Sequence, residues 1–179
     1  MSNIILIGYM GCGKSALGKR LSYVLKQPYL DTDKMIEAKE KRSINAIFET
    51  QGEAAFRDME TACVKSLFAN TQDYVIAVGG GLPLREENRT LLRKLGQVIY
   101  LRAKPETIYE RLKDDDTRPL LKGDNPRQKI AEMIAARGPV YEEAAHIRID
   151  VDGKSFEELL VEIKEKIVEY AGSQNIIKP

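Results

Sequence analysis

Short apolar runs alternate along the chain with segments in which apolar residues recur at helical spacing. Continuous apolar runs of this length are typical of parallel strands that are buried on both faces. Such runs lie at residues 4–7, 75–78 and 98–101, and two further short strands are predicted at 29–31, which ends on Asp31, and at 147–149, which contains Arg148. The helical spacing predicts helices over 14–26, 33–69, 86–95, 105–112, 127–144 and 155–171. The alternation predicts an α/β fold with a central parallel five-stranded sheet and helices on both faces.

Three local features refine this outline. Ser43 is placed to cap a helix, and Gln51–Gly52 is predicted to break the long helical region. Residues 113–126 (KDDDTRPLLKGDNP) are polar and contain Pro and Gly, so they predict a mobile loop. The tail, residues 172–179, is expected to fray. The length of 179 residues predicts a single domain over 1–179.

Charge and composition argue against several kinds of partner. The 28 basic and 27 acidic residues give no electrostatic case for nucleic acid or a membrane surface, and the balanced surface favours a monomer. No apolar run approaches the roughly 18 residues that span a bilayer, and the N-terminus lacks the features of a signal peptide. Two cysteines fit a cytoplasmic protein. Cys12 is interpreted as a small loop filler, Cys63 as core, and His146 as a residue without a chemical role.

The first apolar run leads into Gly8–Ser15 (GYMGCGKS), which fits the pattern G-x-x-x-x-G-K-[ST]. Glycines let backbone N–H groups curl around phosphate oxygens, and the following helix directs its positive end at the same point. Lys14 is expected to reach the β- and γ-phosphates, and the Ser15 hydroxyl to bind Mg²⁺. The flanking strand and helix disfavour the alternative, a turn that binds nothing. The segment therefore predicts a P-loop for a nucleoside triphosphate.

Two further features follow strand ends: Asp31–Asp33 and Gly79–Gly81. Ligands of parallel α/β sheets bind beyond the carboxyl ends of the strands, so we expect both features to meet the P-loop at one rim. Each feature also has a plainer explanation, because aspartates cap helices and glycines form turns.

Several charged residues likewise allow two interpretations. Glu53 and Glu60 lie four residues before and three residues after Arg57, on the same helix face. They could hold the guanidinium in a binding site, or the three could form a surface salt-bridge cluster. Arg118 and Arg137 could be solvated charges. The absence of an N-K-x-D segment argues against a GTPase and leaves small-molecule kinases, nucleotide kinases and ATPases.

Taken in order, the motifs resemble the shikimate kinase family. The P-loop is followed by D-T-D (31–33), F-R-x-x-E (56–60), G-G-G (79–81), R-P-L-L (118–121) and R-x-P-x-Y (137–141). The resemblance covers roughly residues 4–170. It implies a three-layer P-loop kinase fold with a lid at about 113–126.

The resemblance implies a site for shikimate, a ring that carries one carboxylate and three hydroxyls. Arg57 and Arg137 would bind the carboxylate, since a planar guanidinium matches a carboxylate bidentately. Asp33 would orient the 3-hydroxyl and could act as its base, and Gly79, Gly80 and Gly81 would let backbone approach the substrate. Residues 31–62 would form the substrate-binding helical region.

The resemblance also implies the nucleotide side. Asp31 would act through water at one Mg²⁺ per subunit, beside Ser15. Arg118 would be the lid arginine that closes over the phosphates. Ala16 stands where many members carry threonine, so we expect about 1 kcal/mol less affinity for ATP. The implied ATP contacts are Gly11, Cys12, Gly13, Lys14, Ser15, Ala16, Arg111, Arg118 and Lys154.

The implied activity is phosphorylation of the 3-hydroxyl of shikimate by ATP, in the pathway to chorismate and the aromatic amino acids. Lys14, Asp33 and Arg118 would be the catalytic residues, with shikimate and ATP as small-molecule partners. Two alternatives stay open. One is a related kinase of gluconate or a nucleoside monophosphate, and the other is a non-catalytic ATP-binding module. The arginine pair favours a carboxylated polyol, and the complete catalytic set disfavours the module.

Overall fold

The computed structural model describes residues 2–113 and 125–176. Within these residues, five parallel strands form one sheet in the order β2-β3-β1-β4-β5. The strands are β1 (Asn3–Ile7), β2 (Tyr29–Asp31), β3 (Val75–Ala77), β4 (Gly96–Arg102) and β5 (Ile147–Asp150). The predicted parallel sheet is therefore confirmed.

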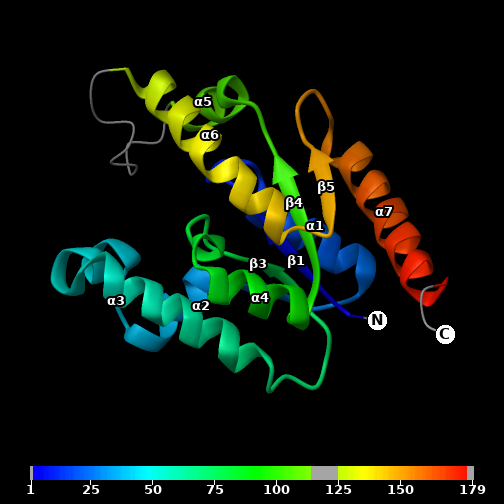
Figure 1. Cartoon of the computed structure of the whole chain (residues 1–179), viewed down its shortest axis with the longest axis horizontal. Helices are drawn as coiled ribbons and strands as arrows, with labels where there is room; N and C mark the ends of the chain where they lie inside the picture. The colour runs from blue at the N-terminus through cyan, green and yellow to red at the C-terminus, as the bar shows by residue number, and fades with distance from the viewer. Residues whose placement is uncertain (1, 114–124, 177–179) are drawn as a thin grey trace.

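Helices cover both faces of this sheet. They are α1 (Lys14–Leu25), α2 (Thr32–Glu40), α3 (Ile44–Leu67), the 3-10 helix η1 (Leu82–Leu84), α4 (Glu86–Leu95), α5 (Pro105–Leu112), α6 (Pro126–Ala144) and α7 (Phe156–Ile176). One layer holds α1 and α7, which contact each other and pack on β3 and β5 respectively. The other layer holds α4 and α6, which both pack on β4, with α3 against α4 (Figure 1).

The central strand shows why the strands are continuous apolar runs. Ile5, Leu6 and Ile7 of β1 have no solvent exposure, because helices cover both faces of the sheet. A strand buried on both faces gains from an apolar side chain at every position rather than at every second one. The three-layer architecture follows from this pattern.

The register of the strands brings separate segments to one rim. Leu6 of β1 pairs with Ala77 of β3, and Ala77 pairs with Asp31 of β2. The loop after β1, the start of α2 and the run Gly79–Gly81 therefore leave the sheet at one level. Since β1 lies between β3 and β4, this rim also contains the crevice where ligands bind in such sheets.

The long helical region divides as the sequence predicted. The Ser43 hydroxyl accepts a hydrogen bond from the backbone N–H of Ala46 at 3.2 Å, which caps α3. Gly52 interrupts the helical path with φ 80° and ψ 173°, a conformation that glycine adopts without steric cost. Helices α2 and α3 pack on each other beside the rim (Figure 1).

The predicted end of the last helix at residue 171 is wrong, because α7 continues to Ile176. Gly172 does not stop the helix, and the Ser173 hydroxyl donates back to the carbonyl of Tyr170 at 2.8 Å. Of the predicted lid, residues 114–124 lie outside the described residues, as do 177–179 of the predicted frayed tail. In the part of the chain that the structure describes, no helix has the length and apolar character of a membrane span.

Candidate active site

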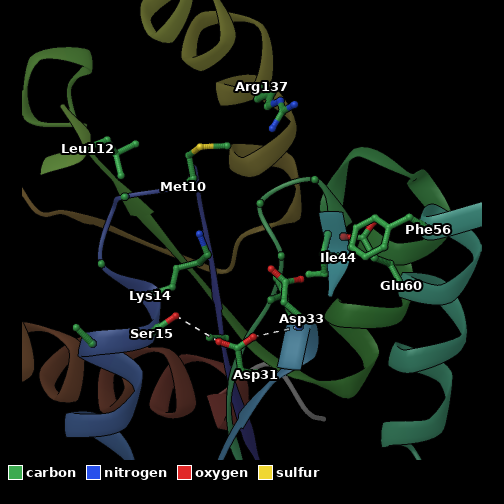
Figure 2. A pocket seen from close by; sticks show the side chains of 18 of the residues that line it. Met10, Lys14, Ser15, Asp31, Asp33, Ile44, Phe56, Glu60, Leu112 and Arg137 are labelled. Carbon is green, nitrogen blue, oxygen red and sulfur yellow. Dashed lines mark hydrogen bonds between the residues drawn. The ribbon is translucent and has the colours of Figure 1, made fainter. Parts of the chain in front are cut away.

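A pocket of about 510 Å³ opens at the carboxyl end of the sheet (Figure 2). It gathers most of the predicted site residues from six separate parts of the fold. Those that line it are Gly11, Gly13, Lys14, Ser15, Ala16, Asp31, Asp33, Arg57, Gly79, Gly80, Gly81, Arg111 and Arg137. Cys12 does not line it, because its side chain is buried within the loop, as expected of a filler.

The loop between β1 and α1 has the conformation that its glycines permit. Gly8, Gly11 and Gly13 all have positive φ, at 141°, 76° and 105°. The Lys14 ammonium donates to the carbonyls of Gly8 at 2.8 Å and Tyr9 at 3.0 Å, so it is held inside the curve of the loop. This arrangement places a cation and the N-terminus of α1 at one anion-binding point.

Asp31 serves the fold and faces the pocket at once. Its Oδ1 accepts hydrogen bonds from the backbone N–H groups of Asp33 at 3.1 Å and Lys34 at 3.3 Å, which caps α2. Its Oδ2 accepts from the Ser15 hydroxyl at 3.3 Å and from the Tyr29 hydroxyl at 3.1 Å (Figure 2). Burial raises the pKa of Tyr29 to about 12, so the phenol keeps its proton for this bond. One carboxylate oxygen therefore remains directed at the P-loop serine.

The interpretation of Glu53 and Glu60 as a support for Arg57 is confirmed. The Arg57 guanidinium donates to Glu53 at 2.8 Å and to Glu60 at 2.7 Å. The Arg57 side chain is 15% exposed and Glu60 is 1% exposed, so this pair is not a solvated surface pair, whereas Glu53 is 67% exposed and holds Arg57 from the solvent side. Burial raises the pKa of Glu60 to about 7, while the nearby guanidinium opposes this shift. The pair thus fixes a cation in the wall of the pocket.

The glycine run makes room for these charged side chains. A Cβ on Gly79 would lie 2.5 Å from the Asp33 carboxylate, and a Cβ on Gly81 would overlap the Arg57 guanidinium. Thr32 is fully buried, and its hydroxyl accepts a hydrogen bond from the Gly79 N–H at 3.0 Å. The structure therefore ties the D-T-D segment to the glycine run, which the two patterns alone did not reveal.

Arg137 reaches the pocket from α6, on the side away from Asp33 and Glu60 (Figure 2). Its guanidinium carbon lies 5.8 Å from the centre of the Tyr9 ring. An aromatic face at this distance attracts a cation. Two arginines from different helices therefore face one space that also contains the Asp33 carboxylate.

Sequence reasoning missed most of the apolar lining of the pocket. Ile44, Phe48 and Phe56 form an apolar wall, while Met10 and Leu112 lie across the pocket on the side of the P-loop (Figure 2). The rings of Phe48 and Phe56 lie 4.8 Å apart, and Phe48 is 37% exposed. The spacing of Ile44 and Phe48 by four residues was the available signal, since it places both on one face of α3. An apolar wall opposite polar groups suits a small ring with hydroxyls on its edge.

Two of the predicted ATP contacts, Arg111 and Lys154, behave differently. The Arg111 guanidinium donates to the carbonyls of Gly11 and Cys12, both at 3.2 Å, and so lies against the P-loop. Lys154 does not line the pocket, and its ammonium pairs with Glu162 at 2.5 Å. Arg118 lies outside the described residues.

His146 and Cys63 do not line the pocket. His146 accepts a hydrogen bond from the Val98 N–H at 3.0 Å through Nδ1, and burial lowers the pKa of its imidazole to about 4. Cys63 packs against a small apolar cluster of α2 and α3, which consists of Ile36, Ile47 and Phe56. Burial raises the pKa of the Cys63 thiol to about 11.

A P-loop, two arginines and a carboxylate around one pocket define a class of protein, the P-loop kinases that phosphorylate small acceptors. The comparisons with known proteins identify the family within that class. The family model described as shikimate kinase matches residues 10–168, and the chain belongs to the shikimate kinase family.

Curated and solved relatives agree with this assignment. A shikimate kinase of Symbiobacterium thermophilum is 44% identical over 169 residues, which cover 93% of this chain and 97% of the relative. The structure of shikimate kinase from Acinetobacter baumannii in complex with shikimate is similar with a TM-score of 0.87 and 35% identity, covering 99% and 96% of the two chains. A gluconokinase from Sinorhizobium meliloti shares the fold, with a TM-score of 0.59, 14% identity and coverage of 99% and 98%.

Proposed function

We propose that this enzyme transfers the γ-phosphoryl group of ATP to the 3-hydroxyl of shikimate and forms shikimate 3-phosphate and ADP. The observation that carries the proposal is the placement of Arg57 and Arg137 around the pocket that the P-loop closes. Two guanidinium groups suit a carboxylated acceptor, and the Asp33 carboxylate in the same pocket suits a hydroxyl. Family membership supports the same substrate.

On the donor side, the chain supplies positive charge and N–H groups. The backbone N–H groups of the loop and the first turn of α1 bind the phosphate oxygens, and Lys14 binds the β- and γ-phosphates. These groups stabilise the negative charge that moves toward the leaving oxygen as the bond to the γ-phosphorus breaks. Arg111 supports the loop through the carbonyls that it contacts.

On the acceptor side, the chain supplies orientation. Arg57 and Arg137 bind the carboxylate, which fixes the ring against the apolar wall. Asp33 accepts a hydrogen bond from the 3-hydroxyl and takes its proton as the oxygen bonds to phosphorus. In a loose phosphoryl-transfer transition state this positioning contributes more than the strength of the base.

The donor atoms beside the P-loop fit one Mg²⁺. Ser15 Oγ and Asp31 Oδ2 lie 3.3 Å apart and are both oxygen donors, the type that Mg²⁺ prefers. We assign Ser15 as a direct ligand and Asp31 as a ligand through water. When bound, the ion neutralises charge on the β- and γ-phosphates.

The remaining assignments rest on the family resemblance. Arg118 acts as the lid arginine over the phosphates, and residues 113–126 form the lid. The product enters the pathway to chorismate, and the balanced charge, the small size and the two cysteines support a monomer in the cytoplasm. Residues 31–62 form the acceptor-binding region of one domain.

The test is a coupled assay of ADP release with ATP and Mg²⁺, run in parallel with shikimate, gluconate and AMP. We expect strong turnover with shikimate and little with the other two acceptors. Turnover that favours gluconate or AMP would refute the acceptor assignment. Binding of ATP without turnover of any acceptor would instead support a non-catalytic module.

A further inference from the structure

Helix α6 carries a second residue that contacts the lining of the pocket, although it does not line the pocket itself. Tyr141 lies four residues after Arg137, so both side chains lie on one face of the helix. Tyr141 is 1% exposed, and its hydroxyl donates a hydrogen bond to the carbonyl of Gly80 at 2.6 Å. This bond joins α6 directly to the glycine run that lines the pocket.

The chemistry of a phenol suits this position. A phenolic oxygen has one proton to donate and lone pairs to accept with, whereas a carbonyl only accepts and a guanidinium only donates. The proton of Tyr141 goes to Gly80, which leaves its lone pairs for the neighbouring Arg137. Burial raises the pKa of Tyr141, and the nearby positive charge of Arg137 acts in the opposite direction. Because the hydroxyl is bonded to Gly80 and lies one helical turn from Arg137, it can serve as a bridge between the two.

The helix alone does not fix the position of Arg137. Gly138 and Pro139 stand between it and Tyr141. Proline has no N–H, so the bond from residue 139 to the carbonyl of Ala135 is missing, and glycine adds backbone freedom. A side-chain anchor at this point compensates for a locally weakened helix.

The end of α6 beyond this point is held firmly. The Arg93 guanidinium of α4 donates to the carbonyls of Glu143, Ala144 and Ala145 at 3.0 to 3.3 Å. The Tyr141 ring also packs against Tyr100 of β4, with ring centres 5.2 Å apart. Tyr141 is thus fixed to the sheet, while Arg137 lies on the other side of Gly138 and Pro139.

Gly80 in turn lies against the P-loop. A Cβ built on Gly80 would be 3.4 Å from the carbonyl oxygen of Gly8 and 3.6 Å from the amide nitrogen of Met10. The Gly80 carbonyl, which accepts the bond from Tyr141, therefore belongs to a segment that lines the pocket and also contacts the P-loop.

We propose that the Tyr141 hydroxyl is a positioning group that sets Arg137 and the Gly80 backbone for the carboxylated acceptor. It acts through these two residues and does not touch the reacting atoms. The inference rests on the proposed function, because it presumes that Arg137 binds the carboxylate of shikimate. A purely structural tyrosine would affect stability and both substrates alike.

The experiment compares Tyr141→Phe with Tyr100→Phe. Both changes remove one buried phenolic oxygen from the same pair of rings, but Tyr100 is not bonded to the glycine run. We expect Tyr141→Phe to raise KM for shikimate about tenfold, with KM for ATP within about twofold of wild type, since one hydrogen bond is lost. Tyr100→Phe should leave KM for shikimate within about twofold. An unchanged KM for shikimate in Tyr141→Phe, or equal rises for both substrates, would overturn the proposal.

A double variant tests the route of action. If Tyr141 acts partly through Arg137, its replacement in an Arg137→Ala background should raise KM for shikimate by clearly less than tenfold. A full tenfold rise in that background would overturn the link to Arg137. Wild-type enzyme without shikimate turnover would instead refute the proposed function itself.

A measurement on the wild type covers the case in which Tyr141→Phe does not fold. Hydrogen exchange should slow in both of the peptides that cover 79–84 and 137–144 when shikimate binds. When ADP alone binds, the exchange rates of the two peptides should again change in parallel. Protection of the glycine run without protection of α6 would contradict the proposed bridge.

Discussion

The donor half and the acceptor half of the pocket are built in different ways. Most of the donor half comes from one continuous stretch, residues 8–16, between a buried strand and the helix that it starts, with Asp31 and Arg111 in contact with it. The acceptor half comes from separate segments that contribute Asp33, Arg57, the glycine run and Arg137. A local sequence thus determines which donor the enzyme binds, while the packing of distant elements determines the acceptor. Variants in the two halves should therefore fail differently.

The largest expected effect breaks the donor half alone. Lys14→Met removes the ammonium that lies inside the loop and should reduce kcat by about a thousandfold or more, with the fold retained. Lys19→Met, an exposed lysine on the same helix, is the control. Steady-state assays and thermal unfolding measure both, and Lys14→Met activity within tenfold of wild type would contradict the loop assignment.

The second largest effect is expected from a variant in the acceptor half. Arg57→Ala should cost on the order of 2 to 4 kcal/mol in kcat/KM for shikimate, because the carboxylate of bound shikimate loses its guanidinium partner in the pocket. Binding of ATP should change little. Arg85→Ala is a matched control, since Arg85 also pairs with a carboxylate at 2.7 Å but does not line the pocket. Wild-type kcat/KM in Arg57→Ala would reject the role of that arginine.

The pH dependence of the free energy of unfolding tests how Glu60 is held in the acceptor half. The pKa of Glu60 is raised by burial from 4.5 to about 7. Between pH 4.5 and 7 the Glu60 carboxyl is therefore protonated in the folded state and ionised in the unfolded state. This contribution to stability is complete below pH 4.5 and is lost as pH rises through 7. Relative to Glu60→Gln, the free energy of unfolding of the wild type should fall by on the order of 2 to 3 kcal/mol between pH 5 and 8.

Chemical denaturation at a series of pH values measures this difference. The glutamine variant is the control, because it keeps the shape of the side chain and the other titrating groups, including His146. Parallel stability curves for the two proteins would show that Glu60 does not titrate in this range.

The smallest effect is expected from a variant that adds a contact in the donor half. Ala16 lines the pocket at the start of α1 and is exposed. Ala16→Thr adds a hydroxyl beside the phosphates and should tighten binding of ATP by on the order of 1 kcal/mol. Calorimetric titration with ATP measures it, with Ala38→Thr on the exposed surface of α2 as the control. Weaker binding of ATP by Ala16→Thr would count against this account of the position.

The sequence predicts the donor half better than the acceptor half for a physical reason. The spacing of glycines, Lys14 and Ser15 determines a local backbone shape, and the strand before it and the helix after it follow from apolar periodicity alone. The Ser43 cap and the Gly52 break are local in the same sense, and both are confirmed.

The acceptor half depends on contacts that no local pattern contains. The need for glycine at 79 arises from the Asp33 carboxylate, which lies 46 residues earlier in the chain. Phe48 was missed because an exposed aromatic residue on a helix does not reveal which pocket it faces. Lys154 shows the converse, since a position that the family resemblance implied as an ATP contact pairs with Glu162 on α7.

The most direct test of the acceptor half compares kcat/KM for shikimate with that for its methyl ester in the ADP-release assay. The ester keeps the ring and hydroxyls but removes the charge that Arg57 and Arg137 are proposed to bind. The account predicts a loss of about a hundredfold or more for the ester, because two charge-assisted pairings are lost while the guanidinium groups remain desolvated. Equal kcat/KM for the two compounds would contradict it.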